Sequence, residues 1–188
     1  MANVKKNTKL ILKELEINLE KVNNEDLTEF VELILQAKRI FLAGAGRSGL
    51  AIRAFSNRLM HLGFDVSIVG DITTTSAHEG DLLIIGSGSG ETQSLVAMGQ
   101  KAKKNGVKIA LNTINPDSTL GQLADVKFVL PGASPKVEDE ELVGKSVQPM
   151  GSSYEQLSFL IYDAMIMALM EKTGETVETM FPRHANLE

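Results

Sequence analysis

The stretch DLLIIGSGSGET, residues 81–92, joins an apolar run to a turn that is rich in glycine and hydroxyl side chains. A second turn of this kind, Gly44-Ala45-Gly46-Arg47-Ser48-Gly49, follows residues 39–43, which are apolar after Arg39. Each turn leads into a helix-like run, so the chain contains two strand–turn–helix units. Parallel strands bring the helix N-termini of such units to one edge of a sheet, where both can face a single small anion. The two turns therefore predict a binding site for one phosphoryl group.

Short apolar runs alternate with helical patterns through the middle of the chain. This alternation predicts the α/β class, with a three-layer, doubly wound, five-stranded parallel sheet of the flavodoxin-like or Rossmann-like kind. The expected strands span residues 39–43, 64–69, 81–85, 107–111 and 126–130. The helices expected between and after them span residues 49–62, 91–105, 120–124 and 154–172.

Two extra N-terminal helices are expected before the sheet, over residues 4–22 and 24–37. The apolar residues of the first helix cover more than one stripe, which predicts that it has two apolar neighbours. Residues 131–153 show no periodicity and include the acidic run 138–141, so we expect a lid or a mobile segment there.

Length and composition limit the range of architectures. The chain has 188 residues, 43% of them hydrophobic, which suffices for one domain with a full core. We expect a single domain over residues 1–188. It would consist of N-terminal helices over residues 1–37, a core over residues 38–172 and a C-terminal tail over residues 173–188. Because the chain has no cysteine, disulfides and thiol chemistry are excluded.

The charge and hydropathy patterns argue against two classes of partner. The formal net charge is −5, whereas a nucleic-acid-binding protein needs a basic face. The longest apolar stretch, residues 164–170, is too short to span a bilayer, and no targeting segment is visible. We therefore expect a cytoplasmic protein that binds neither nucleic acid nor a membrane. The apolar surface of the first helix and of residues 163–170 predicts a homodimer or homotetramer.

The first glycine-rich turn fits three interpretations. Read as G-x-G-x-x-G, with Asp71 some way beyond it, it matches a dinucleotide fingerprint. Its glycines also fit a tight turn that binds nothing, and the third interpretation is the phosphate site described above.

The second turn favours a phosphate site more strongly, because its backbone N–H groups and the hydroxyls of Ser87, Ser89 and Thr92 can surround phosphate oxygens. Glu91 is expected to point away from the phosphate and to offset a helix dipole.

Residues 44–49 and 87–92 resemble the two phosphate-side motifs of the sugar isomerase (SIS) domain family. Within that family, the chain is similar to the 6-phospho-3-hexuloisomerases. The closer resemblance is carried by Gly46-Arg47-Ser48, Gln148-Pro149-Met150-Gly151-Ser152-Ser153-Tyr154-Glu155 and Arg183-His184-Ala185-Asn186-Leu187. It covers nearly the whole chain. It implies a SIS fold and an enzyme that converts D-arabino-3-hexulose 6-phosphate to D-fructose 6-phosphate through an enediolate, in the ribulose monophosphate pathway that fixes or detoxifies formaldehyde.

The resemblance also implies roles for particular residues. It makes Glu155 the catalytic base, although the spacing Ser152-x-x-Glu155 by itself also fits a capping box. It gives His184 a catalytic role, in its own site or in that of a neighbouring subunit. Arg47 is expected to bind the phosphate or polarise a substrate oxygen, with a surface arginine as the alternative. The residues expected to bind the substrate are Gly46, Arg47, Ser48, Ser87, Gly88, Ser89, Gly90, Glu91 and Thr92.

His61 is a further candidate for the site, although its place at a helix end most simply indicates an interaction with the helix dipole. Neither a metal nor another cofactor is expected, because the sequence offers no convincing cluster of carboxylates and histidines. Three alternative functions remain open: another SIS sugar-phosphate isomerase of the aldose–ketose type, a non-catalytic sugar-phosphate sensor, and a nicotinamide-dependent enzyme.

Overall fold

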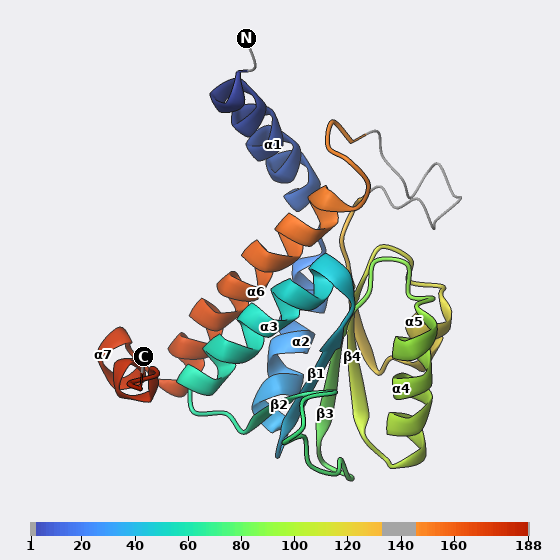
Figure 1. The fold of residues 1–188 in the computed structure, drawn as a ribbon, viewed down its shortest axis with the longest axis vertical. Coiled ribbons are helices and arrows are strands. Elements are labelled where there is room, and N and C mark those ends of the chain that lie inside the picture. Colours follow the sequence, from blue (N-terminus) through green and yellow to red (C-terminus); the bar gives the residue numbers. More distant parts are fainter. Residues whose placement is uncertain (1–2, 133–145, 188) are drawn as a thin grey trace.

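The computed structural model describes residues 3–132 and 146–187, and an all-parallel, five-stranded sheet lies at its centre (Figure 1). The strands, in order across the sheet, are β2 (Val66–Ile68), β1 (Ile40–Gly44), β3 (Leu82–Gly86), β4 (Lys108–Thr113) and β5 (Val126–Val129). This is the flavodoxin-like strand order, in which β1 and β3 are neighbours and the chain reverses direction across the sheet between them. The predicted fold class is confirmed.

Helices cover both faces of the sheet and form the predicted three layers (Figure 1). One face carries α2 (Asn24–Gln36), α3 (Gly46–His61) and α6 (Ser152–Thr173), and α1 (Val4–Leu19) packs against α6. The other face carries α4 (Gln93–Lys104) and α5 (Thr119–Leu123). The chain continues after α6 through α7 (Val177–Met180) and the 3-10 turn η1 (Phe181–Arg183). No helix of the described residues is both long enough and apolar enough to cross a membrane.

The central strand β3 explains why two helical layers are needed. Its side chains alternate between the faces: Leu82 and Ile84 join the core under α2, α3 and α6, whereas Leu83 and Ile85 join the core under α4 and α5. All five residues of β3 are buried. A strand that is apolar on both sides must be covered on both sides, because successive side chains point to opposite faces of a sheet.

The N-terminal helix differs from its prediction. It ends at Leu19 instead of residue 22, and it projects beyond the sheet (Figure 1). Leu15 is buried, whereas Leu10, Leu12 and Ile17 remain exposed in the single chain. Within residues 3–132 and 146–187, α6 packs against this helix, but part of its apolar surface has no neighbour. The predicted lid over residues 131–153 lies mostly outside the described residues.

Arg39 and Asp81 join the sheet and the β2–β3 connection at the edge opposite the two glycine-rich turns. Asp81 is buried, and its carboxylate accepts hydrogen bonds from Arg39 Nη2 at 2.7 Å, Arg39 Nε at 3.2 Å and the His78 N–H at 2.8 Å. Burial raises the pKa of the Asp81 carboxyl, but the bonds from Arg39 and His78 outweigh it and hold the pKa below its ordinary value. The ionised form of Asp81 therefore stabilises the fold.

The substitution Asp81→Asn is expected to lower the free energy of unfolding by about 3 kcal/mol at pH 7, because it leaves Arg39 without its buried partner. A carboxyl whose pKa is depressed in the folded state contributes stability above about pH 4, and that contribution is lost as the pH falls through the folded-state pKa. The deficit of the variant should therefore shrink between pH 7 and pH 3 in urea denaturation. Asp117→Asn, at an exposed position, is the control; equal deficits in the two variants would contradict this role for Asp81.

Candidate active site

The two glycine-rich turns meet at the carboxyl edge of the sheet. β1 and β3 are parallel neighbours whose register pairs Gly44 with Gly86, so the turns that follow them lie side by side. The first turn opens α3 at Gly46, and the second opens α4 after Thr92. Both helix N-termini, with their unpaired N–H groups, therefore face the same region, as the sequence predicted.

A pocket of about 300 Å³ lies between these turns and the start of α6. The first turn contributes Ala45, Gly46 and Ser48, and the second contributes Gly86, Ser87, Gly88, Ser89 and Thr92. Leu95, Ile114, Met150, Gly151, Tyr154 and Glu155 complete the lining. One side of the pocket is thus rich in hydroxyl and backbone groups, and the other carries a carboxylate that comes from far along the chain.

Ser87 is the most informative hydroxyl in this lining. Its residue is 4% exposed, and its Oγ atom has no hydrogen-bond partner among the described residues. A buried hydroxyl without a partner costs free energy, so such groups in native structures call for an explanation. An oxygen-rich anion held in the pocket would supply the missing partner.

The β4–α5 connection holds the second turn in shape. Gly90 has a φ of +66°, and a Cβ at this position would overlap the Ser118 side chain. The Gly88 carbonyl accepts hydrogen bonds from the Ile114 N–H at 2.9 Å and Thr113 Oγ1 at 3.1 Å. The glycine at position 90 is therefore required by both backbone conformation and space.

Glu91 points away from the pocket, as predicted, and the pocket lining includes neither Glu91 nor Gly90. Its carboxylate accepts hydrogen bonds from the Thr119 N–H at 2.6 Å and Thr119 Oγ1 at 2.9 Å. The charge therefore lies at the first turn of α5, where it complements the positive end of that helix instead of the end of α4. This contact ties the phosphate-side turn to the next strand–helix connection.

Glu155 lies in the first turn of α6 and lines the pocket. The N-cap of α6 is Gly151, without a side-chain cap bond among the described residues, so the capping-box interpretation of Ser152 and Glu155 is wrong. The Glu155 carboxylate instead accepts a hydrogen bond from Arg47 Nε at 2.5 Å. The Glu155 side chain is 19% exposed and the Arg47 side chain 62%. A pocket carboxylate and a solvent-facing guanidinium therefore form the polar end of the site.

His61 and His184 lie together at the opposite end of α3. Their rings stack with centroids 5.2 Å apart, and Arg58 Nη1 lies 3.3 Å from His61 Nδ1. Burial, with contributions from Arg58 and His184, lowers the pKa of His61. The 16 residues of α3 span about 24 Å, so neither histidine can reach Glu155 of its own chain in this conformation.

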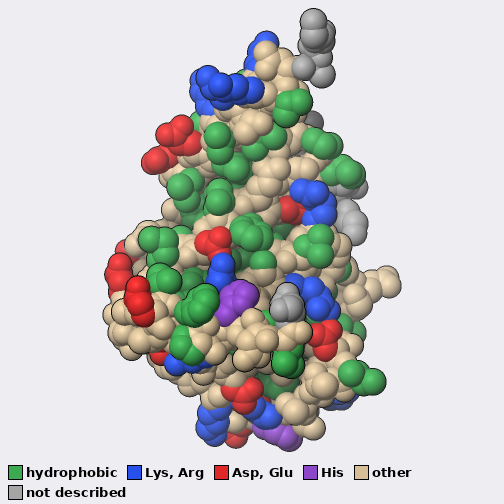
Figure 2. All heavy atoms as spheres, turned by 60° about the vertical axis from the view of Figure 1, so that its left-hand side comes forward, with side chains coloured by type: hydrophobic (Ala, Val, Ile, Leu, Met, Phe, Trp, Pro, Cys, Tyr) green, Lys and Arg blue, Asp and Glu red, His purple; other side chains and the backbone are tan. Residues whose placement is uncertain are grey.

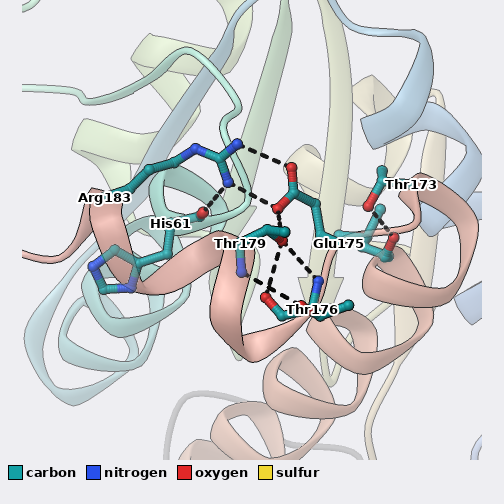
Figure 3. A network of polar contacts seen from close by, with 7 residues as sticks. His61, Thr173, Glu175, Thr176, Thr179 and Arg183 are labelled. Atoms are coloured by element: carbon teal, nitrogen blue, oxygen red, sulfur yellow. Dashed lines mark hydrogen bonds and ion pairs between the residues drawn. The ribbon is translucent and has the colours of Figure 1, made fainter.

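The position of the tail is fixed by a network around Arg183, which Figure 3 shows from close by. Arg183 Nη1 donates hydrogen bonds to the His61 carbonyl and to Glu175 Oε2, both at 2.9 Å, and Nη2 donates to Glu175 Oε1 at 3.0 Å. The bond from Arg183, followed by that from Thr179, lowers the pKa of Glu175. Sequence reasoning singled out the Arg183–His184 pair but not Glu175, whose only sequence signal is its place just after the helix.

Other residues of the lining were not singled out by sequence reasoning. Met150, Gly151 and Tyr154 fall in the segment that carries the family resemblance, but no chemistry was assigned to them. Tyr154 is buried, and its hydroxyl donates to the Asn112 carbonyl at 3.0 Å. Burial raises the pKa of Tyr154 well above its ordinary value, so this hydroxyl stays protonated. Leu95 and Ile114 carry no signal beyond an apolar side chain near an element end.

Asp71, the acidic residue of the dinucleotide interpretation, lies elsewhere. Its carboxylate is 2.7 Å from Arg53 Nη2 in an ion pair. The two residues line a different cavity, of about 290 Å³, between α3 and the edge strand β2. Asp71 is therefore not brought to the pocket between the glycine-rich turns.

Comparison with known proteins places this geometry in context. The SIS domain model matches residues 33–160. The chain is 50% identical to the 3-hexulose-6-phosphate isomerase of Bacillus subtilis (strain 168) over 178 residues, which is 95% of each chain. It is 39% identical to the 3-hexulose-6-phosphate isomerase of Mycobacterium gastri over 99% of this chain and 92% of that protein.

A solved structure agrees with these relatives. A hypothetical protein from Methanococcus jannaschii, whose structure was described as inferring the molecular function of a 3-hexulose-6-phosphate isomerase, superposes with a TM-score of 0.80 at 31% identity. The match covers 97% of this chain and 99% of that one. The similarity predicted from the glycine-rich turns, the segment 148–155 and the tail is confirmed.

Gly90→Ala is expected to lower the free energy of unfolding by about 3 kcal/mol or more, because it adds a steric overlap to the cost of about 1–2 kcal/mol for a non-glycine residue at positive φ. The control is Gly174→Ala at the end of α6, where φ is +72° and nothing lies within 4 Å of the Cβ that alanine would add. Urea denaturation of both variants separates the two costs. Similar losses in both would show that Ser118 gives way and does not hold the turn.

Proposed function

We propose that this chain, which belongs to the SIS domain family, is an isomerase that converts D-arabino-3-hexulose 6-phosphate to D-fructose 6-phosphate through an enediolate. The observation that carries the proposal is the pocket itself. It joins a hydroxyl-lined cradle at two helix N-termini to the carboxylate of Glu155. The identity of 50% to the isomerase of Bacillus subtilis, over 95% of both chains, supports the choice of substrate.

The phosphate of the substrate would bind between the two glycine-rich turns. Ser48, Ser87, Ser89 and Thr92 offer hydroxyls there, and the starts of α3 and α4 offer backbone N–H groups. Helix N-termini and such backbone nests favour anions, so no cationic side chain or metal is required for this step. Holding the phosphate at one end fixes the reacting carbons at the other, and binding energy remote from the chemistry is thereby used for positioning.

Glu155 would act as the base. The reaction moves a carbonyl group from C3 to C2: the proton on C2 passes to the carboxylate, the C–H electron pair forms the C2=C3 bond of the enediolate, and O3 takes the negative charge. A proton then moves from O2 to O3, and the protonated Glu155 returns a proton to C3 as C2 becomes the carbonyl. One carboxylate on one face of a cis-enediolate serves both carbons. General acid–base groups of this kind contribute about 10²- to 10⁴-fold each.

Arg47 would exchange partners during this cycle. In the free protein its Nε atom is engaged by Glu155. A substrate oxygen or phosphate in the pocket offers the guanidinium a competing anion, and a base that accepts a proton must release part of this ion pair. Arg47 would then polarise the substrate oxygen on which negative charge develops.

The proton transfer between O2 and O3 is assigned to His184, because an imidazole ring can both donate and accept a proton. In a 3-ketose that carries phosphate on C6, the hydroxyl that would close a five-membered ring on C3 is esterified. The substrate is therefore open-chain, and no ring-opening step is needed in this direction.

His184 would serve the site of a second copy of the chain. An apolar groove of about 480 Å³, between α1, α3 and α6, adjoins the pocket; Glu155 lines both, and Arg47 lines the groove. Leu50, Phe159 and Leu160 in this groove are exposed in the single chain. Figure 2 shows hydrophobic side chains spread over one face of the molecule. We infer a homodimer or homotetramer that covers this groove and brings a partner's tail to Glu155.

The proposal includes a wider setting. We infer that residues 1–188 act as one SIS unit whose residues 38–172 form the sugar-phosphate-binding core. The enzyme would act in the cytoplasm on a small-molecule sugar phosphate. The reaction would belong to the ribulose monophosphate pathway, in which formaldehyde is fixed or detoxified. Its product would be fructose 6-phosphate.

Glu155→Gln is expected to lower kcat by about 10³-fold, because the variant keeps the shape of the side chain but loses the base. An assay coupled to fructose 6-phosphate formation measures kcat, and competitive inhibition by inorganic phosphate measures whether the cradle is intact. The inhibition constant should change by less than about threefold, since the phosphate binds to the other end of the pocket. Glu171→Gln, at an exposed position of the same helix, is the control. Full activity of Glu155→Gln would overturn the base assignment.

The shared site can be tested by mixing two variants. Glu155→Gln and His184→Ala are each expected to be nearly inactive, but co-expressed subunits would form some sites that combine Glu155 from one chain with His184 from another. If equal amounts of the two chains assemble at random, about a quarter of the sites combine both intact residues. The mixture should therefore recover about a quarter of the wild-type activity. If the mixture stays as inactive as its components, His184 does not act in a neighbouring subunit.

A further inference from the structure

The first turn of α6 carries Glu155, and the Ser152 N–H at its start donates a hydrogen bond to the Pro149 carbonyl at 3.2 Å. Its N-cap, Gly151, makes no side-chain cap bond among the described residues. Met150, immediately before it, has a φ of +49°. Residues other than glycine and asparagine rarely adopt this backbone conformation. The first N–H groups of a helix have no intrahelical partner, so a helix start of this kind depends on contacts from outside. The position of Glu155 depends on the same contacts.

Glu14 of α1 supplies the first of these contacts. Its Oε1 atom accepts a hydrogen bond from Ser146 Oγ at 2.6 Å. Its Oε2 atom accepts from the Val147 N–H at 3.3 Å and from Gln148 Nε2 at 3.4 Å. The Gln148 N–H in turn donates to Ser146 Oγ at 3.0 Å, which closes the turn around the carboxylate. One side chain thus holds three consecutive residues of the segment that leads into the pocket at Met150.

Asn18, one helical turn after Glu14, supplies the second contact. Its Nδ2 atom donates a hydrogen bond to Ser153 Oγ at 2.9 Å. Ser153 is 1% exposed and lies two residues before Glu155 in α6. Residues four apart lie on one face of a helix, so Glu14 and Asn18 both face this segment. Leu15, buried between them, packs α1 against the core.

We propose that Glu14 and Asn18 are positioning residues for the catalytic base, and that α1 serves the active site by fixing where α6 begins. The proposal rests on the proposed function, since it concerns the reactivity of Glu155. Glu14 binds residues 146–148 before the helix start, and Asn18 binds Ser153 in the first turn itself. The two contacts therefore lie on either side of Met150 and Gly151. The phosphate cradle is built by other elements and does not depend on them.

The proposal predicts an effect on turnover that is larger than the effect on binding. Glu14→Ala and Asn18→Ala should each lower kcat by about 10- to 100-fold, since a displacement of about 1 Å at a reacting group can cost 10²-fold. Inhibition by inorganic phosphate should change by less than about threefold, because the cradle is intact. Glu14→Gln keeps an acceptor for Ser146 Oγ but places an amide N–H₂ group against the Val147 N–H, so its kcat should fall between those of Glu14→Ala and the wild type. Glu16→Ala, at an exposed position of the same helix, is the control and should match the wild type.

A double variant shows whether these residues act through Glu155. Added to Glu155→Gln, the substitution Glu14→Ala should cost little further activity, because residues that work as a unit are not additive. Hydrogen exchange of the backbone amides of residues 152–155 gives a readout that needs no turnover, and it should be faster in Glu14→Ala and Asn18→Ala than in Glu16→Ala.

Each outcome has one meaning. Unchanged exchange at residues 152–155, an unchanged kcat in both single variants, or an equal loss from Glu14→Ala with and without Glu155 would overturn the positioning role. Full activity of Glu155→Gln, or no conversion of the hexulose phosphate by the wild type, would instead overturn the proposed function, and the exchange data would still report whether α1 supports the start of α6.

Discussion

The structure depends on the parallel pairing of β1 with β3. This pairing sets Gly44 beside Gly86, so the two glycine-rich turns leave the sheet at adjacent points and their helices start at the same place. The second turn offers backbone N–H groups and hydroxyls to a phosphoryl group, and the first turn adds a second helix N-terminus that faces the same region. The buried Ser87 Oγ has no partner among the described residues, which supports the proposal that this arrangement binds a ligand. Everything else in the site is placed relative to that cradle.

Much of the fold can be predicted from the sequence, because each strand and helix is marked by a pattern within its own residues. The apolar runs of β1 and β3 and the helices after them are visible in the residues themselves, and the need to cover both faces of β3 follows from its uninterrupted apolar character. Seven residues proposed for the cradle and the base lie together in one pocket, although Glu155 is distant in the sequence: Gly46, Ser48, Ser87, Gly88, Ser89, Thr92 and Glu155. Its inclusion came from the resemblance to a family and not from any periodicity.

The remaining features depend on contacts between segments that are far apart, which no local pattern encodes. The Ser152-x-x-Glu155 spacing suggested a cap, but α6 begins at Ser152 and Glu155 bonds Arg47 instead. Glu91 was expected at the dipole of a helix, yet the helix is α5 and the partner is Thr119. Likewise, the Arg183 network turns the tail back onto the end of α3, so His184 meets His61 and not the pocket. These outcomes are decided by tertiary geometry.

His184 lies far from Glu155 in the single chain, and the apolar groove beside the pocket is exposed. Both observations support the proposal that a second copy of the chain completes the site. The glycine-rich turns and Glu155 nevertheless line the pocket of one chain, and a crystal structure with bound fructose 6-phosphate would test their proposed roles. We expect the phosphate within hydrogen-bond distance of Ser87 Oγ and Ser89, with C2 and C3 of the sugar facing the Glu155 carboxylate. A phosphate bound elsewhere, or a sugar whose C2 and C3 lie away from Glu155, would contradict it.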